Sequence, residues 1–333
     1  MNFNSFRVRF FAIAALSWFA AVSPALAQEW PDKPIRLIVP APPGGIIDTV
    51  ARALGDQLRT NLGQAVVIDN KPGGSAVVAE RALMATPTDG YTLMVGPSSL
   101  LSDFPLTVKT PFDPNKTFTY VAAVANMVHI LVANPSFPAN NVEEVLAQAK
   151  KDPKSVSIAN VSVGTRSHFL GEMLREKSGG NILSVPYKGS APAMVDLMGN
   201  QVQLSFETVT GSVAQTIKSG KLKGLAVISP TRSQYLPNVP SFGELGLSEF
   251  VLNEASIGVF ILSSMPKPLT DRIRNEVVKA AHSPKMREML AAQGLDVPKD
   301  ASIEELRQKM AATMEQNRKI IDKLKLNLTA ASN

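Results

Sequence analysis

The sequence contains no cysteine and only three histidines, His129, His168 and His282. The absence of cysteine excludes disulfides, thiolate nucleophiles and zinc sites built from cysteine. Three histidines this far apart in the chain do not supply a convincing multi-histidine metal site, although a site made of oxygen ligands alone stays possible. Redox chemistry carried by side chains is therefore excluded, and we expect neither a metal nor any other cofactor.

The chain also has little charge, since 19% of its 333 residues are charged while 45% are hydrophobic. This composition supplies enough apolar material for a packed core and is too poor in charge for a disordered polymer. The length favours about two domains. The formal net charge of +6 comes from basic residues that are scattered among acids and lack interleaved aromatic residues. No nucleic-acid footprint follows from such a pattern.

Residues 1–27 have the features of a secretory signal peptide. Arg7 and Arg9 give a positive start, residues 10–22 form an apolar run, and the last three residues form a small-x-small cleavage site. A membrane anchor is the alternative, but the apolar run of 13 residues is shorter than the roughly 20 needed to span a bilayer. We expect cleavage after Ala27, a periplasmic protein that does not span the membrane, and a mature net charge of +4.

Short apolar runs alternate with amphipathic helical stretches, which is typical of parallel βαβ units. Residues 35–39 predict a buried strand between two prolines, and the apolar spacing of 49–62 predicts a helix. Further strands are expected at 65–69, 91–95, 120–125, 129–133, 155–159, 182–185, 203–206, 222–228 and 257–262, and further helices at 80–84, 142–150, 167–177, 191–198, 213–218, 269–282, 284–293 and 302–326.

This alternation predicts an α/β protein with two lobes, each a mostly parallel sheet flanked by helices. A polar segment rich in proline and glycine, 229–247, suggests a crossing between the lobes, and the apolar run at 257–262 fits a return to the first sheet. We therefore predict a discontinuous first lobe of residues 28–124 plus 241–333 and a second lobe of residues 125–240.

The sequence lacks the common catalytic motifs, including G-x-S-x-G, H-E-x-x-H, a Walker loop and G-x-G-x-x-G. Ser167 and His168 are adjacent, so on a helix they face different ways and form no catalytic dyad by themselves. A binding protein is favoured over an enzyme. A secreted α/β hydrolase or lyase that acts on a carboxylate remains the alternative, with Tyr187, Lys188 and Glu207 as its acid–base groups.

A proline- and glycine-rich turn at 39–48 links a predicted strand to a predicted helix. Its glycines, Gly44 and Gly45, allow backbone N–H groups to approach a ligand, and the following helix N-terminus favours a carboxylate. The alternative is an ordinary turn in which Asp48 serves as the helix N-cap. The sequence alone leaves both interpretations open.

Two further loops follow predicted parallel strands, where open α/β sheets collect ligands. The loop at 160–168 contains hydroxyls, Gly164 and Arg166, whose guanidinium can bind a carboxylate through two hydrogen bonds. The loop at 96–99 contains two serines. A solvated capping loop and a plain polar turn are the respective alternatives. Two lobes with such loops imply a cleft between them.

Sequence blocks distributed over the whole chain after residue 27 carry a family resemblance. They are W-P-D-K-P-I-R-L-I-V-P at 30–40, P-G-G at 43–45, D-N-K-P-G-G at 69–74, P-T-D-G-Y-T-L at 87–93, V-P-Y-K-G-S-A-P-A at 185–193, G-K-L-K-G-L-A-V at 220–227 and L-P-N-V-P-S at 236–241. In this order they resemble the Bug-type substrate-binding proteins of tripartite tricarboxylate transporters.

The resemblance implies a two-lobed periplasmic binding protein fold of the type II kind, a small mono-, di- or aromatic carboxylate as ligand, and membrane transporter subunits as partners of a monomer. It also implies that the ligand lies between the first glycine loop and the loop that enters the first helix of the second lobe. Carried onto this chain, the ligand-binding residues are Gly44, Gly45, Ile46, Asp48, Ser98, Gly164, Thr165, Arg166, Ser167, His168, Glu207 and Thr208.

Two of these residues depart from the family pattern and pull in opposite directions. Arg166 would favour a second carboxylate on the ligand, whereas Glu207 would oppose one or attract an amine if it faces the cleft. The sequence does not name the ligand.

Overall fold

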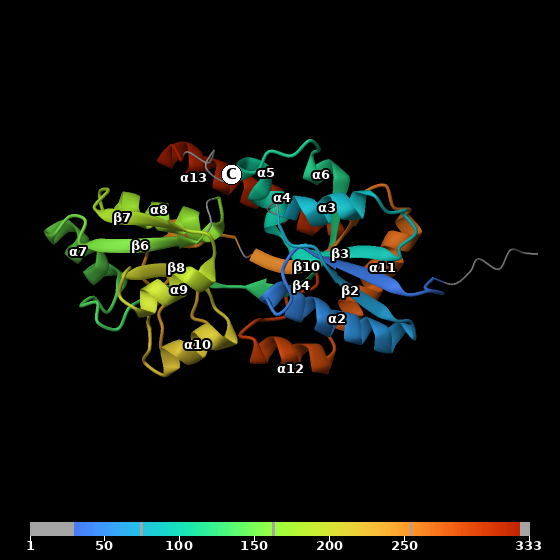
Figure 1. Cartoon of the computed structure of the whole chain (residues 1–333), viewed down its shortest axis with the longest axis horizontal. Helices are drawn as coiled ribbons and strands as arrows, with labels where there is room; N and C mark the ends of the chain where they lie inside the picture. The colour runs from blue at the N-terminus through green and yellow to red at the C-terminus, as the bar shows by residue number, and fades with distance from the viewer. Residues whose placement is uncertain (1–29, 74–75, 162–163, 254, 327–333) are drawn as a thin grey trace, which may run out of the picture.

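The computed structural model describes residues 30–73, 76–161, 164–253 and 255–326, so the predicted signal peptide lies outside the described residues. Two lobes lie side by side, and each contains a five-stranded sheet with helices on both faces (Figure 1). The predicted α/β class with two lobes and mostly parallel sheets is confirmed.

The first sheet has the strand order β2 (Val66–Asn70), β1 (Ile35–Val39), β3 (Thr92–Pro97), β10 (Ala255–Leu262) and β4 (Phe118–Met127). β1 pairs in parallel with β2 and β3, whereas β10 is antiparallel to β3 and β4. The apolar run at 257–262 therefore does return to the first sheet, as predicted.

Helices cover both faces of this sheet, so β1 contributes side chains to two cores. Leu37 packs with α2 (Ile46–Leu62), α11 (Lys267–Ala281) and α12 (Pro284–Ala292). Ile38 packs on the other face with α3 (Val77–Met84), α4 (Ser99–Ser102) and the first half of α13 (Ile303–Leu324). Burial on both faces explains the continuous apolar sequence of the strand. The short helices α5 (Phe104–Thr107) and α6 (Pro114–Thr117) follow α4.

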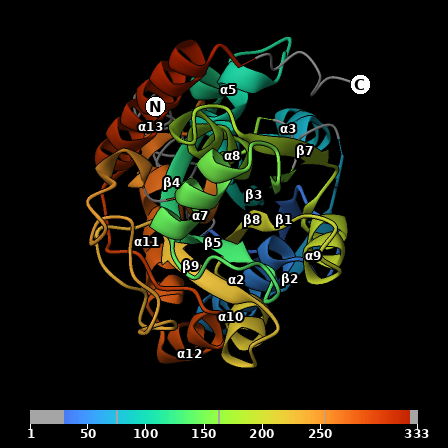
Figure 2. The same ribbon diagram turned by 90° about the vertical axis from the view of Figure 1, so that its left-hand side faces the viewer.

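The second sheet has the strand order β7 (Ile182–Tyr187), β6 (Val156–Val161), β8 (Leu204–Thr208), β5 (His129–Ala133) and β9 (Lys223–Val227). β5 is the antiparallel strand, since it pairs in that sense with both β8 and β9. α7 (Val142–Lys151) and α8 (Arg166–Lys177) cover one face, and α9 (Ser190–Met198) and α10 (Gly211–Lys218) cover the other. Figure 2 views the molecule from this lobe.

The chain passes twice between the lobes. It passes first at Val128, between β4 and β5, and returns between the short helix η3 (Ser248–Phe250) and β10. Phe242, Phe250 and Leu252 pack in the core of the second lobe. This packing places the return later in the chain than the predicted boundary at residue 240, and the exact lobe boundaries remain a prediction.

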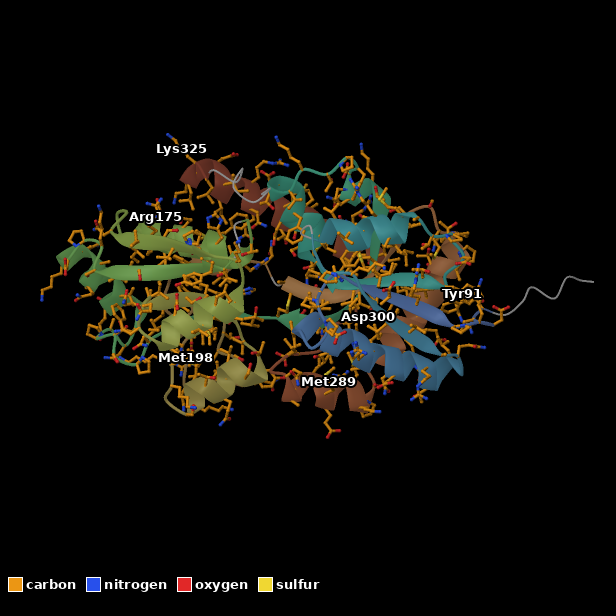
Figure 3. All side chains as sticks on the ribbon, viewed as in Figure 1. Tyr91, Arg175, Met198, Met289, Asp300 and Lys325 are labelled. Carbon is orange, nitrogen blue, oxygen red and sulfur yellow. The ribbon has the colours of Figure 1, made fainter. Side chains whose placement is uncertain are left out.

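The lobes also touch on both sides of these crossings. On one side α13 contacts α4 and β4 of the first lobe and α8 of the second, and Figure 3 shows Lys325, just beyond α13, above Arg175 of α8. On the other side α10 lies next to α12 (Figure 1), where the N–H of Gly211 donates to the carbonyl of Gln293 at 2.8 Å. The space between the lobes is thus bounded on two sides.

Candidate functional site

A cavity of about 480 Å³ lies where Ile46 of the first lobe faces the second lobe. The ends of β6 and β8 and the first residues of α8, α9 and α10 supply most of its wall. The lining residues are Ile46, His129, Val161, Thr165, Arg166, Ser167, Ser190, Met194, Phe206, Glu207, Thr208, Thr210, Ser212 and Val213. Its size is within the range of small-molecule binding sites.

A smaller cavity of about 150 Å³ adjoins the first one and shares His129, Thr165, Arg166 and Thr208 with it. Its remaining wall comes mainly from the first lobe and the crossings, through Ser99, Asp103, Phe104, Met127 and Ala255. The two cavities together therefore run from the second lobe to the α4–α5 region of the first.

The glycine loop of the first lobe is held by Asp48 from inside helix α2. Asp48 Oδ2 accepts hydrogen bonds from the N–H of Gly44 and from Arg52 Nε, both at 2.9 Å, and Oδ1 accepts one from Asn70 Nδ2 at 2.8 Å. The hydrogen bond from Arg52 is the main reason why the pKa of Asp48 falls to about 2. The interpretation of Asp48 as the N-cap is wrong, because the helix starts at Ile46 with Gly45 as its cap.

The first turn of α2 begins at the cavity wall. Gly45 makes no side-chain capping bond, and the first N–H groups of a helix have no acceptor within the helix. Ile46, the first helical residue, lines the cavity. The turn therefore presents N–H donors and the positive end of the helix dipole at this point.

The loop that enters α8 is fixed by its own hydrogen bonds. The N–H of Gly164 donates to His168 Nδ1 at 3.1 Å, Thr165 Oγ1 donates to the carbonyl of Val161 at 2.5 Å, and Ser167 Oγ donates to the carbonyl of Phe206 at 2.8 Å. Gly164 has a φ of +83°, and a Cβ atom there would lie 2.8 Å from Cβ of Thr107 in the first lobe. A glycine is thus required where this loop meets the first lobe.

His168 supports the loop from behind and is not one of the described residues that line the cavity. Burial lowers its pKa, and its Nδ1 must be unprotonated to accept from Gly164. Ser98 is also used within the protein. Its N–H donates to the carbonyl of Ser256 at 2.7 Å, and its Oγ accepts from the N–H of Ser256 at 3.1 Å. Both residues therefore position backbone around the cavity.

Arg166 lies at the junction of the lobes and is 8% exposed. Its Nη1 donates to the carbonyl of Asn253, in the second crossing, and the residue lines both cavities. Burial lowers the pKa of Arg166 and the charge of Asp103 opposes this effect. Burial, and secondarily the arginine, lowers the pKa of His129 to about 3, so His129 is neutral. The guanidinium is thus partly engaged before any ligand arrives.

Glu207 lines the cavity and is 4% exposed. Ser205 Oγ donates to its Oε1 at 2.7 Å, and Ser190 Oγ, at the start of α9, donates to its Oε2. Burial raises the pKa of the carboxyl. The neighbouring Thr208 lines both cavities. Arg166 and Glu207 thus both face the space between the lobes, a point that the sequence leaves open.

The structure brings six of the twelve predicted residues to the wall of the larger cavity, namely Ile46, Thr165, Arg166, Ser167, Glu207 and Thr208. The other six, Gly44, Gly45, Asp48, Ser98, Gly164 and His168, lie in the supporting loops. Sequence reasoning missed His129, Ser190, Thr210 and Ser212. Ser190 and Thr210 begin helices after strands, a signal that was available, whereas His129 starts an apolar strand and gives none.

The acid–base groups of the enzyme alternative do not gather at the cavity. Tyr187 Oη donates to Asp196 Oδ2 at 2.7 Å, and burial is the main reason why its pKa rises to about 12. Among the described lining residues Glu207 is present without Tyr187 or Lys188. Within the described part of the chain, no group of three or more His, Asp or Glu residues could hold a metal ion. No helix there is long and apolar enough to cross a membrane.

Residues 50–326 match the family described as the tripartite tricarboxylate transporter family receptor. The chain belongs to this family. Among the relatives of this chain, the BugT protein of Bordetella pertussis is 35% identical to it over 274 residues, which cover 82% of this chain and 83% of BugT. The predicted resemblance to Bug-type proteins is confirmed.

Solved structures of similar proteins agree with this family assignment. The periplasmic binding protein BugD is 32% identical and covers 90% of this chain and 99% of its own, with a TM-score of 0.76. A protein of R. palustris solved with adipate is 25% identical and covers 89% of this chain and 99% of its own, with a TM-score of 0.79. This tripartite tricarboxylate receptor therefore has the two-lobed fold of periplasmic binding proteins.

Proposed function

We propose that this protein is an extracytoplasmic solute receptor that binds a small carboxylate in the cavity between its lobes and delivers it to a membrane transporter of the tripartite tricarboxylate type. The observation that carries the proposal is the set of helices that begin at the cavity. α2, α8 and α9 all start there, and their N-cap residues, Gly45, Thr165 and Gly189, make no side-chain capping bond.

Uncapped helix N-termini supply N–H donors and partial positive charge, which suits a carboxylate. α10 differs, because the Oγ1 of its N-cap Thr210 accepts from the N–H of Val213 at 3.2 Å. Adipate, bound by a relative of the same fold, is a small carboxylate, which supports this ligand class. The proposed contacts are the first turn of α2 at Ile46, together with Thr165, Ser167 and Thr208.

The remaining predicted residues have supporting roles in this proposal. Gly44, Gly45 and Asp48 hold the first loop, Gly164 and His168 hold the second, and Ser98 ties β3 to β10. Export of the chain by residues 1–27, with cleavage after Ala27, places the receptor in the periplasm. Closure of the lobes on the ligand then gives the form that the transporter recognises.

A thermal-shift screen of the purified protein against mono-, di- and aromatic carboxylates tests the proposal. At least one acid should raise the melting temperature in a saturable way, by about 5 °C at a hundredfold excess over its Kd. The uncharged methyl ester of that acid is the matched control and should give no shift, because it lacks the anion. A broad panel in which no carboxylate stabilises the protein contradicts the receptor function.

A further inference from the structure

The cavity contains a carboxylate of the protein itself, that of Glu207. The side chain is buried, and its hydrogen-bond partners are the hydroxyls of Ser190 and Ser205. Among the described residues Glu207 forms no ion pair, and the contacts of its carboxyl oxygens are these two hydroxyls. Glu207 is therefore a buried carboxyl group whose hydrogen-bond partners are neutral hydroxyls.

Ionisation of the carboxyl is costly there, because two hydroxyls replace the hydration of a carboxylate only in part. Each carboxylate oxygen can accept a further hydrogen bond beside the one it receives from serine. Glu207 lines the cavity, so the space for such a donor is the space that a ligand occupies. Among the described residues no cation is paired with Glu207, and a ligand can supply one there.

Arg166 is not the cationic partner of Glu207. Its Nη1 donates to the carbonyl of Asn253, and its charge acts on Asp103 of the first lobe. A ligand carboxylate next to Glu207 would bring two negative charges together in a buried site, which is unfavourable. The starts of α2 and α8 suit one ligand carboxylate. The Glu207 carboxyl already lies at the start of α9, where Ser190 Oγ donates to it, and this end of the cavity suits a positive group.

We propose that Glu207 determines specificity and that the receptor takes amino carboxylates, with a protonated amine on Glu207, in preference to plain dicarboxylates. This inference rests on the proposed receptor function and names its substrate class. The ligand carboxylate lies against the first turns of α2 and α8. Its ammonium group donates to Glu207 in the direction left open by Ser190 and Ser205.

The test uses pairs of ligands of similar length in which an ammonium group replaces a carboxylate. In the pairs β-alanine with malonate, γ-aminobutyrate with succinate and δ-aminovalerate with glutarate, a –CH2NH3⁺ group stands in place of one carboxylate and the number of carbons is equal. The α-amino acids with their deaminated acids complete the panel. In calorimetric titrations of the purified protein, we expect an amino member to bind at least about tenfold more tightly than its partner, since charge-assisted hydrogen bonds are strong.

Glu207→Gln keeps the shape of the side chain and removes its charge. It should weaken that amino ligand by about tenfold or more and leave the ligand without an amine unchanged or bound more tightly. The matched control is Glu80→Gln, which alters another buried glutamate, 2% exposed, in α3 and away from the cavity lining. It should leave the ratio of the two affinities unchanged.

Two results overturn the proposal. One is a wild-type protein that binds the acid without an amine more tightly in every pair. This result contradicts the proposal even if the Glu207→Gln variant folds poorly. The other is a folded Glu207→Gln variant with the same ratio of affinities as the wild type. If no carboxylate binds, with or without an amine, the receptor function itself fails and the assignment of Glu207 fails with it.

Discussion

At the scale of single residues, three charged side chains around the cavity have different partners and so different roles. Asp48 is paired with Arg52 and accepts from the backbone of Gly44, and Arg166 donates to the carbonyl of Asn253. The partners of Glu207 within the described part of the chain are two hydroxyls. The partners decide which charge is available to a ligand. Asp48 is paired with a cation of the protein, whereas the donors to Glu207 are neutral hydroxyls.

Asp48 should make the stability of the protein depend on pH in acid. Its pKa is lowered in the folded state from 3.8 to about 2, so its contribution is present above about pH 4 and is lost as the pH falls toward 2. Asp48→Asn should cost about 1 to 2 kcal/mol of unfolding free energy at pH 7, after allowance for the exposed Arg52. Urea unfolding of both proteins at pH 7 and pH 3 measures this.

The difference between wild type and Asp48→Asn should shrink by about half between pH 7 and pH 3. Asp56→Asn is a suitable control, because Asp56 lies on the same helix with an exposed side chain near Arg59. A loss for Asp48→Asn that is equal at both pH values would show that the charge of Asp48 contributes nothing.

The sequence identifies Asp48 and Glu207 as residues of interest but not what they do. Glycine-rich turns after strands are visible in the sequence, so the loop at 39–48 could be predicted. The partner Asn70 is 22 positions away from Asp48 and belongs to β2. Contacts of this kind depend on the order of the strands in the sheet, which no local sequence pattern indicates.

At the scale of secondary structure, the starts of helices define the chemistry of the cavity. α2 comes from the first lobe, and α8, α9 and α10 come from the second. Thr210 caps α10 with its own side chain, whereas α2, α8 and α9 lack such a cap. The starts of α2 and α8 should therefore be the ones that a ligand carboxylate satisfies, because the Glu207 carboxyl already lies at the start of α9.

Ile46→Pro tests the donor role of α2 directly. Proline is tolerated at the first position of a helix, and Gly45 has φ −74° and ψ 165°, which suit a residue before proline. The variant loses one N–H, so it should bind the carboxylate about tenfold more weakly with little change in melting temperature. Ligand titration together with thermal unfolding separates the two effects.

Ile303→Pro is the matched control, because Ile303 is the first residue of α13 and Ser302 before it has φ −60° and ψ 159°. Ile303 lies outside the cavity lining. If the Ile46→Pro and Ile303→Pro variants bind the carboxylate with equal affinity, the N–H of Ile46 does not contribute to ligand binding.

Strands and helices with a clear apolar pattern could be predicted well from the sequence. The strand at 129–133 has the predicted bounds, and the helix expected at 142–150 ends one residue later. The short helices α4, α5 and α6 were not predicted, since four residues are too few to show a helical period. Asp103, which lies between α4 and α5, was missed for this reason.

At the scale of the whole molecule, two opposite charges face the smaller cavity from different lobes. Arg166 begins α8 in the second lobe, and Asp103 belongs to the first. Burial raises the pKa of Asp103 and the arginine lowers it. Asn317 of α13 and Ser102 both donate to Asp103 Oδ1. This pair should favour the closed arrangement of the lobes.

Asp103→Asn should shift the receptor toward an open form, because it removes the charge and keeps a carbonyl that accepts from Asn317 and Ser102. Without ligand, small-angle scattering should give a larger radius of gyration than for the wild type. Ligand affinity should fall about tenfold, since binding must then supply the closure energy. Asp56→Asn again serves as control, and a variant with unchanged scattering and affinity would contradict the role of the pair.

Helix α13 restricts how the lobes can separate. Leu306 and Met310, near its start, are buried in the first lobe, whereas Ile320 and Leu324, near its end, are only partly buried against the second. Lys323 adds an ion pair to Glu176 of α8 at 3.2 Å. When the lobes open, the last turns of α13 must therefore separate from α8 while its first turns stay packed on the first lobe. The amides of those last turns should then exchange with solvent faster in the empty receptor than in the loaded one, which makes the C-terminal helix a natural reporter of occupancy.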